Sequence, residues 1–131
     1  GTTPPTGIES GPYTDAALAL ERLGNLPAAR AAYRAGHARW PDDVTLAIGL
    51  GNTAYAQGDL DAAEDALRAA ATAHPDSDAV LNNLAHILME RGRLDEAEAL
   101  ARRAVDLAGP KLAIARTTLA DIRARRDPGA R

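Results

Sequence analysis

The sequence predicts an all-α protein built as a solenoid of helix-turn-helix units. The chain has 131 residues, and most of it repeats with a period of 34 positions. The residues that keep this spacing are Gly24, Gly58 and Gly92, then Leu26, Leu60 and Leu94, then Ala29, Ala63 and Ala97. Pro41 and Pro75 close two of the units, and Gly109-Pro110 closes the third. A fixed period of this length is the signature of a solenoid, in which each unit buries its apolar face against its neighbours.

The composition indicates a helical core made of small residues. Hydrophobic residues make up 46% of the chain, but aromatic residues only 3%, and there is no Phe. A core of Ala and Leu packs helices closely but buries little apolar area per residue. The absence of Cys excludes a thiol nucleophile, a disulfide framework and a zinc ribbon. No apolar run has the length of a membrane span, so we expect no direct membrane insertion.

The charge is distributed unevenly but forms no basic stripe. Residues 1–66 carry nine acidic and four basic side chains, and residues 67–131 carry nine and eleven, for a net charge of −3. We therefore expect no nucleic-acid partner. Fourteen Arg against one Lys, with abundant Ala, suggests a bacterial source, and both the cytoplasm and the periplasm or cell envelope remain open. We take Gly1 as a cloning remnant and the rest as a piece of a longer protein.

The helices follow from start and stop signals along the chain. Residues 1–12 have the composition of a flexible linker, with three each of Pro, Gly and Thr. A first helix is expected over residues 13–23, and Gly24 takes the left-handed position after it. Pro27 opens the second helix, which stops before Pro41. The further helices are expected over residues 43–57 (with Asp42 or Asp43 as N-cap), 61–74, 76–91 (begun by Asp76, Ser77 and Asp78), 95–108 and 111–126.

The three units resemble tetratricopeptide repeats. The middle unit carries the small and large residues of that pattern at Gly51, Ala63 and Ala70, at Leu50, Leu60 and Leu67, and at the closing Pro75. The repeats are placed at residues 10–43, 44–77 and 78–109, with a capping helix over 111–126, in one domain spanning 10–131. The resemblance implies a right-handed α-α superhelix of seven helices that serves protein–protein interaction.

A physical reason for the repeat is visible in the residues themselves. Ala or Gly stands at positions 17 and 29, 51 and 63, and 85 and 97, where the two helices of each unit must approach closely. Each helix pair keeps an uncovered apolar face that only the next unit can bury. The last helix is expected to turn Leu112, Leu119 and Ile122 toward the third unit.

No catalytic, cofactor or metal site is expected. Residues 49–54 fit a dinucleotide fingerprint, but they lie inside a predicted helix rather than after a strand, and close packing explains Gly51. His86 and Glu90 share a helical face as two metal ligands might, but no third ligand is apparent. The only serines, Ser10 and Ser77, are not in a nucleophile motif. The chain is therefore not expected to be an enzyme.

In this family the first helix of each unit lines a concave groove, which identifies the candidate peptide-binding residues. They are Asn52, Tyr55, Asn82, Asn83, His86, Met89, Arg116 and Arg123. Asn52 and Asn83 match the asparagine positions of a clamp for a partner's terminal carboxylate, whereas Ile48, Ala113 and Thr117 stand at its basic positions. Arg116 and Arg123 are expected to make one end of the groove the place for acidic groups.

Two functional interpretations remain. The first is a protein-interaction module that binds a peptide or partner domain. The alternative is a structural or self-association module packed on an enzyme domain of the same longer chain. Its architecture looks like that of bacterial envelope proteins that join such repeats to a cysteine peptidase.

Overall fold

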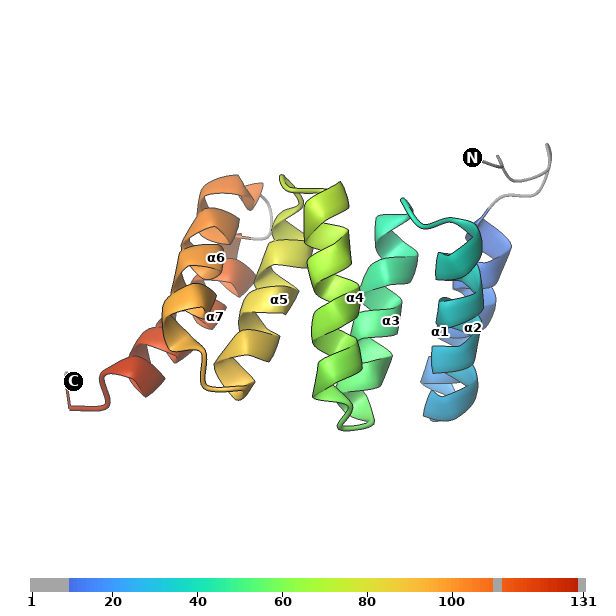
Figure 1. Ribbon diagram of the computed structural model, residues 1–131, viewed down its shortest axis with the longest axis horizontal. Coiled ribbons are helices and arrows are strands. Elements are labelled where there is room, and N and C mark those ends of the chain that lie inside the picture. Colours follow the sequence, from blue (N-terminus) through green and yellow to red (C-terminus); the bar gives the residue numbers. More distant parts are fainter. Residues whose placement is uncertain (1–9, 110–111, 130–131) are drawn as a thin grey trace. The chain divides into compact units, whose positions relative to one another are not determined.

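Seven α-helices follow one another in the computed structural model, which describes residues 10–109 and 112–129 (Figure 1). Their bounds are α1 Gly11–Arg22, α2 Leu26–Arg39, α3 Val44–Ala56, α4 Leu60–Ala73, α5 Asp78–Glu90, α6 Leu94–Leu107 and α7 Leu112–Arg126. The chain forms two compact units that divide between Ala66 and Leu67, inside α4. The predicted all-α class and the seven helices are confirmed for the described residues.

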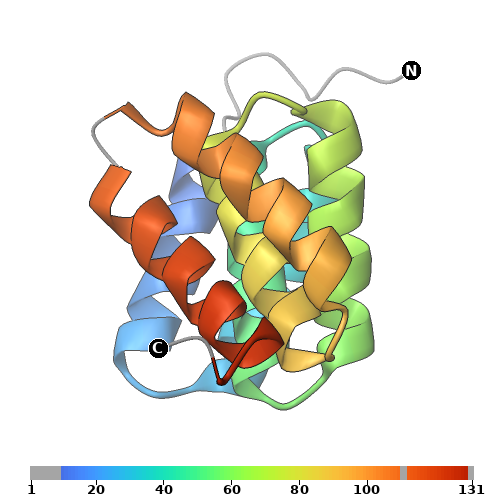
Figure 2. The same cartoon turned by 90° about the vertical axis from the view of Figure 1, so that its left-hand side faces the viewer.

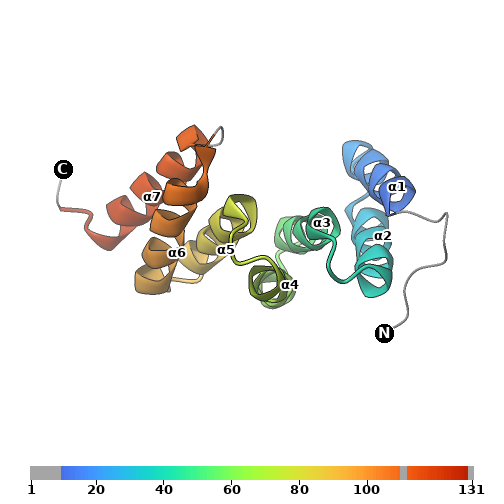
Figure 3. The same ribbon diagram turned by 90° about the horizontal axis from the view of Figure 1, so that it is seen from above.

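In the first unit α2 packs against α1 on one side and α3 on the other, and α1 also touches α3 (Figure 3). Its core is formed by Ala17, Tyr33 and Leu46, with Trp40 and Leu50 packed at the edge. The Trp40 ring also meets Tyr13 edge to face, with ring centroids 5.1 Å apart. Arg39 lies over the Trp40 ring, 5.0 Å from its centroid. A few large rings therefore fill the space that the alanines leave.

Tyr33 can enter this core only because residue 49 has no side chain. A Cβ built on Gly49 would lie 2.2 Å from Tyr33 Cε1. The Tyr33 hydroxyl donates a hydrogen bond of 2.7 Å to Glu21 Oε1. Burial raises the pKa of Tyr33 well above its ordinary range, and the neighbouring Glu21 carboxylate raises it further. Gly49, the first glycine of the dinucleotide-like run, thus serves packing inside α3, whereas the sequence suggests this role for Gly51.

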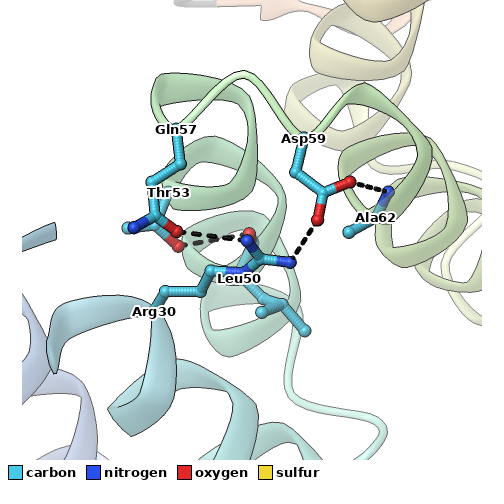
Figure 4. A network of polar contacts seen from close by, with 6 residues as sticks. All are labelled: Arg30, Leu50, Thr53, Gln57, Asp59 and Ala62. Atoms are coloured by element: carbon cyan, nitrogen blue, oxygen red, sulfur yellow. Dashed lines mark hydrogen bonds and ion pairs between the residues drawn. The ribbon is translucent and has the colours of Figure 1, made fainter. Parts of the chain in front are cut away.

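A polar network joins α2 to the turn between α3 and α4 (Figure 4). Arg30 Nη2 donates to Asp59 Oδ2 at 2.7 Å, and Nη1 donates to Gln57 Oε1 at 3.1 Å. Asp59 also accepts from the backbone N–H of Ala62 at 3.1 Å, which caps the start of α4. The hydrogen bond from Arg30 and that from Ala62 hold the pKa of Asp59 below its usual value. The Asp59 carboxylate therefore caps α4 and also binds Arg30 of α2.

In the second unit α6 packs against both α5 and α7, and α7 also reaches α5 (Figure 2). Leu81, Ala104, Ala108 and Ala115 form a core cluster, and Leu112 packs against it. Leu119 and Ile122 are 9% and 0% exposed. The apolar side of α7 thus lies on α5 and α6, as the capping prediction requires.

The helix boundaries differ from the predicted ones mainly at α1. It begins at Gly11 rather than at residue 13, because Pro12 lies in the first turn, where a missing N–H costs nothing. Residues 1–9 of the expected linker lie outside the described residues. Asp43, one of two predicted N-cap candidates, caps α3 by accepting from Leu46 N at 3.0 Å. Ser77, one of three residues expected to begin α5, is its N-cap and accepts from Val80 N at 3.3 Å. None of the helices described is both long and apolar enough to cross a bilayer.

The three turn glycines take the predicted backbone conformation. Gly24, Gly58 and Gly92 all have φ of 79°. This is the left-handed region, in which a side chain at Cβ is strained. The helix-turn-helix register of the repeats is therefore confirmed.

Replacing Gly58 with valine should lower the free energy of unfolding by about 1–2 kcal/mol, because a β-branched residue is forced into the left-handed region. Urea unfolding followed by circular dichroism measures the loss. Asn tolerates this region better than other residues, so Gly58→Asn should lose less than half as much. Equal losses in both variants would contradict a backbone origin.

Replacing Gly49 with alanine should lower the free energy of unfolding by about 1–3 kcal/mol, because the new methyl group collides with Tyr33. Helix propensity alone predicts a gain of about 1 kcal/mol, so the sign is diagnostic. Gly11→Ala is the matched control, since a Cβ there meets nothing within 4 Å. A stabilised Gly49→Ala variant in thermal unfolding would contradict the close approach.

Candidate functional site

Helix α5 presents a row of polar side chains on the face opposite its core residues. Val80, Leu81, Leu84 and Leu88 are buried, whereas Ala79, Asn82, Asn83, His86 and Glu90 are partly or fully exposed. Spacings of three and four residues put the exposed set on one stripe of the helix. The three predicted residues Asn82, Asn83 and His86 are therefore brought together on one surface.

A pocket of about 170 Å³ opens where the first turns of α5 and α7 lie side by side. Its lining residues are Asp78, Ala79, Asn82 and Asn83 of α5 with Ile114 and Ala115 of α7. The Ile114 side chain is 62% exposed, an unusual state for an isoleucine in a packed helix. Asn82 Oδ1 is inaccessible to solvent and has no hydrogen-bond partner in the structure. The pocket therefore joins apolar walls with polar side chains of α5.

An ion pair occupies the other end of the space between α5 and α7. Arg125 Nη2 lies 3.2 Å from Glu90 Oε1, and His86 Nε2 lies 3.9 Å from the same oxygen. Of the two residues considered as metal ligands, Glu90 thus pairs with the guanidinium of Arg125, and His86 lies near the same carboxylate. No three His, Asp or Glu side chains within residues 10–109 and 112–129 are placed to hold a metal ion. The absence of a metal partner remains a prediction.

Three of the predicted residues are not brought to this surface. Met89 is only 3% exposed and belongs to the core. Arg123 Nε donates to Glu98 Oε1 of α6 at 3.3 Å, and Arg126 also pairs with Glu98. These two arginines, Arg126 foremost, hold the pKa of Glu98 below its usual value. Arg116 is exposed and lies seven residues before Arg123, which places it on the same side of α7.

The remaining predicted residues belong to the first unit. Asn52 is exposed on α3, and Tyr55 is partly buried one turn later. They share a helical face with Thr45 and Ile48. Their role as binding residues stays a prediction.

The prediction missed Asp78, Ile114 and Arg125. On α7, Ile114 and Arg125 are eleven residues apart, three turns of helix, so the sequence places them on one face. A second face carries Arg116 and Arg123. The pattern identifies both faces but not which of them turns toward α5, because that depends on how the helix settles on its two neighbours.

Replacing Asn82 with leucine should raise the free energy of unfolding by about 1 kcal/mol, because a buried acceptor without a partner is removed. Thermal and urea unfolding measure the gain. Asn83→Leu is the matched control, since the Asn83 amide has no such buried atom, and it should give no gain. Equal effects of the two changes would contradict a cost at Asn82.

A comparison with the sequences of curated proteins finds no match. The fold is similar to several solved structures. The type III secretion translocator chaperone SycD of Yersinia enterocolitica, in complex with a peptide of the translocator YopD, is 20% identical with a TM-score of 0.78. That match covers 88% of this chain and 93% of SycD. PcrH of Pseudomonas aeruginosa is 19% identical with a TM-score of 0.82, over 90% and 96% of the two chains.

A third similar structure is the first repeat domain of Spaghetti (RPAP3), bound to the HSP90 peptide SRMEEVD. It is 16% identical with a TM-score of 0.81, over 88% and 91% of the chains. At these identities the likeness shows the fold alone. A family model described as the tetratricopeptide repeat matches residues 14–78 and again residues 48–111. Together with the period, the turn glycines and the buried alanines, this match shows that the chain belongs to the tetratricopeptide-repeat family.

Proposed function

We propose that this chain is a non-catalytic protein-interaction module that binds a peptide segment on the exposed face of α5 and the neighbouring flank of α7. The observation that carries the proposal is a pocket of about 170 Å³ that Asn82 and Asn83 of α5 line together with the exposed Ile114 of α7. Such a pocket, with apolar walls and a few polar side chains, is suited to take part of a bound peptide.

The amide row makes this surface suited to an extended peptide. Side-chain amides both donate and accept hydrogen bonds, so Asn82 and Asn83 can pair with a peptide backbone whatever its sequence. Ile114 offers apolar contact beside them, and His86 extends the row along α5. In the first unit, Asn52 and Tyr55 on α3 are proposed as peptide-binding residues of that unit.

Relatives in fold support this class of function. SycD was solved with a peptide of YopD, and RPAP3 with a peptide of HSP90. PcrH was solved with the chaperone binding region of PopD. We propose the same kind of partner, a protein segment, for this chain, with an affinity of roughly micromolar because the segment must become ordered on binding.

The test is a selection of random linear peptides on the immobilised chain, followed by calorimetric titration of the peptides recovered. Asn83→Ala should weaken binding by about 1–2 kcal/mol without a change in helicity. Arg102→Ala is the control on the outer side of α6, where the side chain is exposed, and it should bind like wild type.

Two results would contradict the proposal. One is unchanged binding by Asn83→Ala together with loss of binding by Arg102→Ala, which would move the working surface to the outer helices. The other is a failure to recover any peptide while the chain sediments as a dimer that Asn83→Ala dissociates. That result would favour the alternative interpretation, a structural or self-association module.

A further inference from the structure

We propose that α1 is the contact surface of a dimer in which two copies of this chain pair their first helices in antiparallel orientation. The partner is a second copy because the exposed face of α1 is complementary to itself. This inference goes beyond the proposed function, since α1 belongs to the first unit and the pocket that carries the proposed function belongs to the second.

Helix α1 leaves most of its apolar side chains exposed. Its buried residue is Ala17, whereas seven of the thirteen residues of α5 are buried. Leu18 is 36% exposed, Ala16 and Ala19 are exposed as well, and Leu23 just after the helix is 81% exposed. The side of α1 that turns away from the core therefore offers small and apolar side chains to a partner.

Two opposite charges frame this face. Asp15 and Arg22 are exposed, and neither makes an ion pair or a side-chain hydrogen bond with another of the residues that the structure describes. They are seven residues apart, which is two turns of helix and about 10 Å along its axis, so they lie on one side of α1. Ala19 lies between them on that side, and Ala17 turns the opposite way into the core. An acid, a small residue and a base thus follow one another along the outer face.

This order is complementary to itself when the two helices run antiparallel. A two-fold axis between residues 18 and 19 places Asp15 of each copy opposite Arg22 of the other. The same axis sets each Leu18 against an Ala19, which is small enough to let the helices approach closely. A parallel pair would bring like charges together at both ends of the contact. The charges therefore select one orientation, and the assembly closes at two copies.

The last helix offers no comparable surface. Arg116 and Arg123 are exposed on α7 and are also seven residues apart. Two α7 helices paired in either orientation would set arginine against arginine, and α1 paired with α7 would set Arg22 against one of them. Pairing α1 with α1 is therefore the combination of first and last helices in which each of these charges meets one of opposite sign.

Sedimentation equilibrium at low ionic strength should show the chain in a monomer–dimer equilibrium. Two helices of 12 residues bury less area than the roughly 1,200 Å² at the lower end of stable interfaces. The dissociation constant should therefore be about 0.1 mM. Because the paired charges lie at the surface, raising the salt concentration to about 0.5 M should weaken the dimer several-fold.

Charge reversal tests the pairing directly. Asp15→Arg (D15R) and Arg22→Asp (R22D) each place like charges opposite one another and should weaken the dimer at least about tenfold. An equimolar mixture of the two variants should dimerise again, because the acids of one then face the bases of the other, and so should the double variant D15R/R22D. Misfolding would give no such rescue. Asp106→Arg (D106R) on α6 is the matched control, because it makes the same change of charge at an exposed acid of the second unit, and it should leave the equilibrium unchanged.

A chain that stays monomeric at about 1 mM, ten times the expected dissociation constant, would overturn the inference. So would a dimer that D15R and R22D leave intact, or one that their mixture and the double variant fail to restore. Dimerisation that appears only after removal of residues 1–9 would assign the face of α1 to the preceding segment and would overturn the inference as well. Each of these results leaves the proposed function standing, because that function is tested by peptide binding at Asn83.

Discussion

Fully buried alanines stand where the two helices of a pair are expected to approach most closely. Ala17 of α1 and Ala29 of α2 have no exposed surface, and neither do Ala85 of α5 and Ala97 of α6. When only alanines separate two helices, the distance between their axes lies near the lower end of the usual range. The two backbones then make many weak van der Waals contacts. The tight turns at Gly24 and Gly92 serve this approach, because the second helix must begin almost where the first one ends. A larger side chain at any of these crossings would open the pair and displace the faces that the next helix covers.

The close approach leaves volume to be filled elsewhere, and the two units meet this need differently. In the first unit one large ring, Tyr33, enters the space above Gly49 and ties its hydroxyl to Glu21. In the second unit Leu and Ala fill the core, and the space between the first turns of α5 and α7 stays open as a pocket. The buried, unpaired Asn82 carbonyl beside this opening is a local cost in stability.

The fold could be predicted from the sequence almost to the residue, because each level of the pattern favours the same structure. The glycines at the turns, Asp43 and Ser77 at the caps and the alanines at the crossings are local signals that repeat. The candidate surface could be predicted only in part. Asn82, Asn83 and His86 share a helical face by spacing alone. Met89 is buried and Arg123 pairs with Glu98 of α6, and both outcomes depend on how the helices pack rather than on a repeated spacing in the sequence.

The distribution of the aromatic residues has a consequence for optical experiments. Trp40 and all three tyrosines, Tyr13, Tyr33 and Tyr55, precede the division inside α4, so the second unit contains no aromatic residue. Near-ultraviolet absorption and intrinsic fluorescence therefore arise from the first unit alone, whereas the far-ultraviolet signal of the helices arises from both. The chromophores of the first unit include Trp40, which contacts both Tyr13 and Arg39, whereas the second unit contributes nothing in the near-ultraviolet. Any interval between the two signals during unfolding measures how tightly the two halves of the solenoid are coupled.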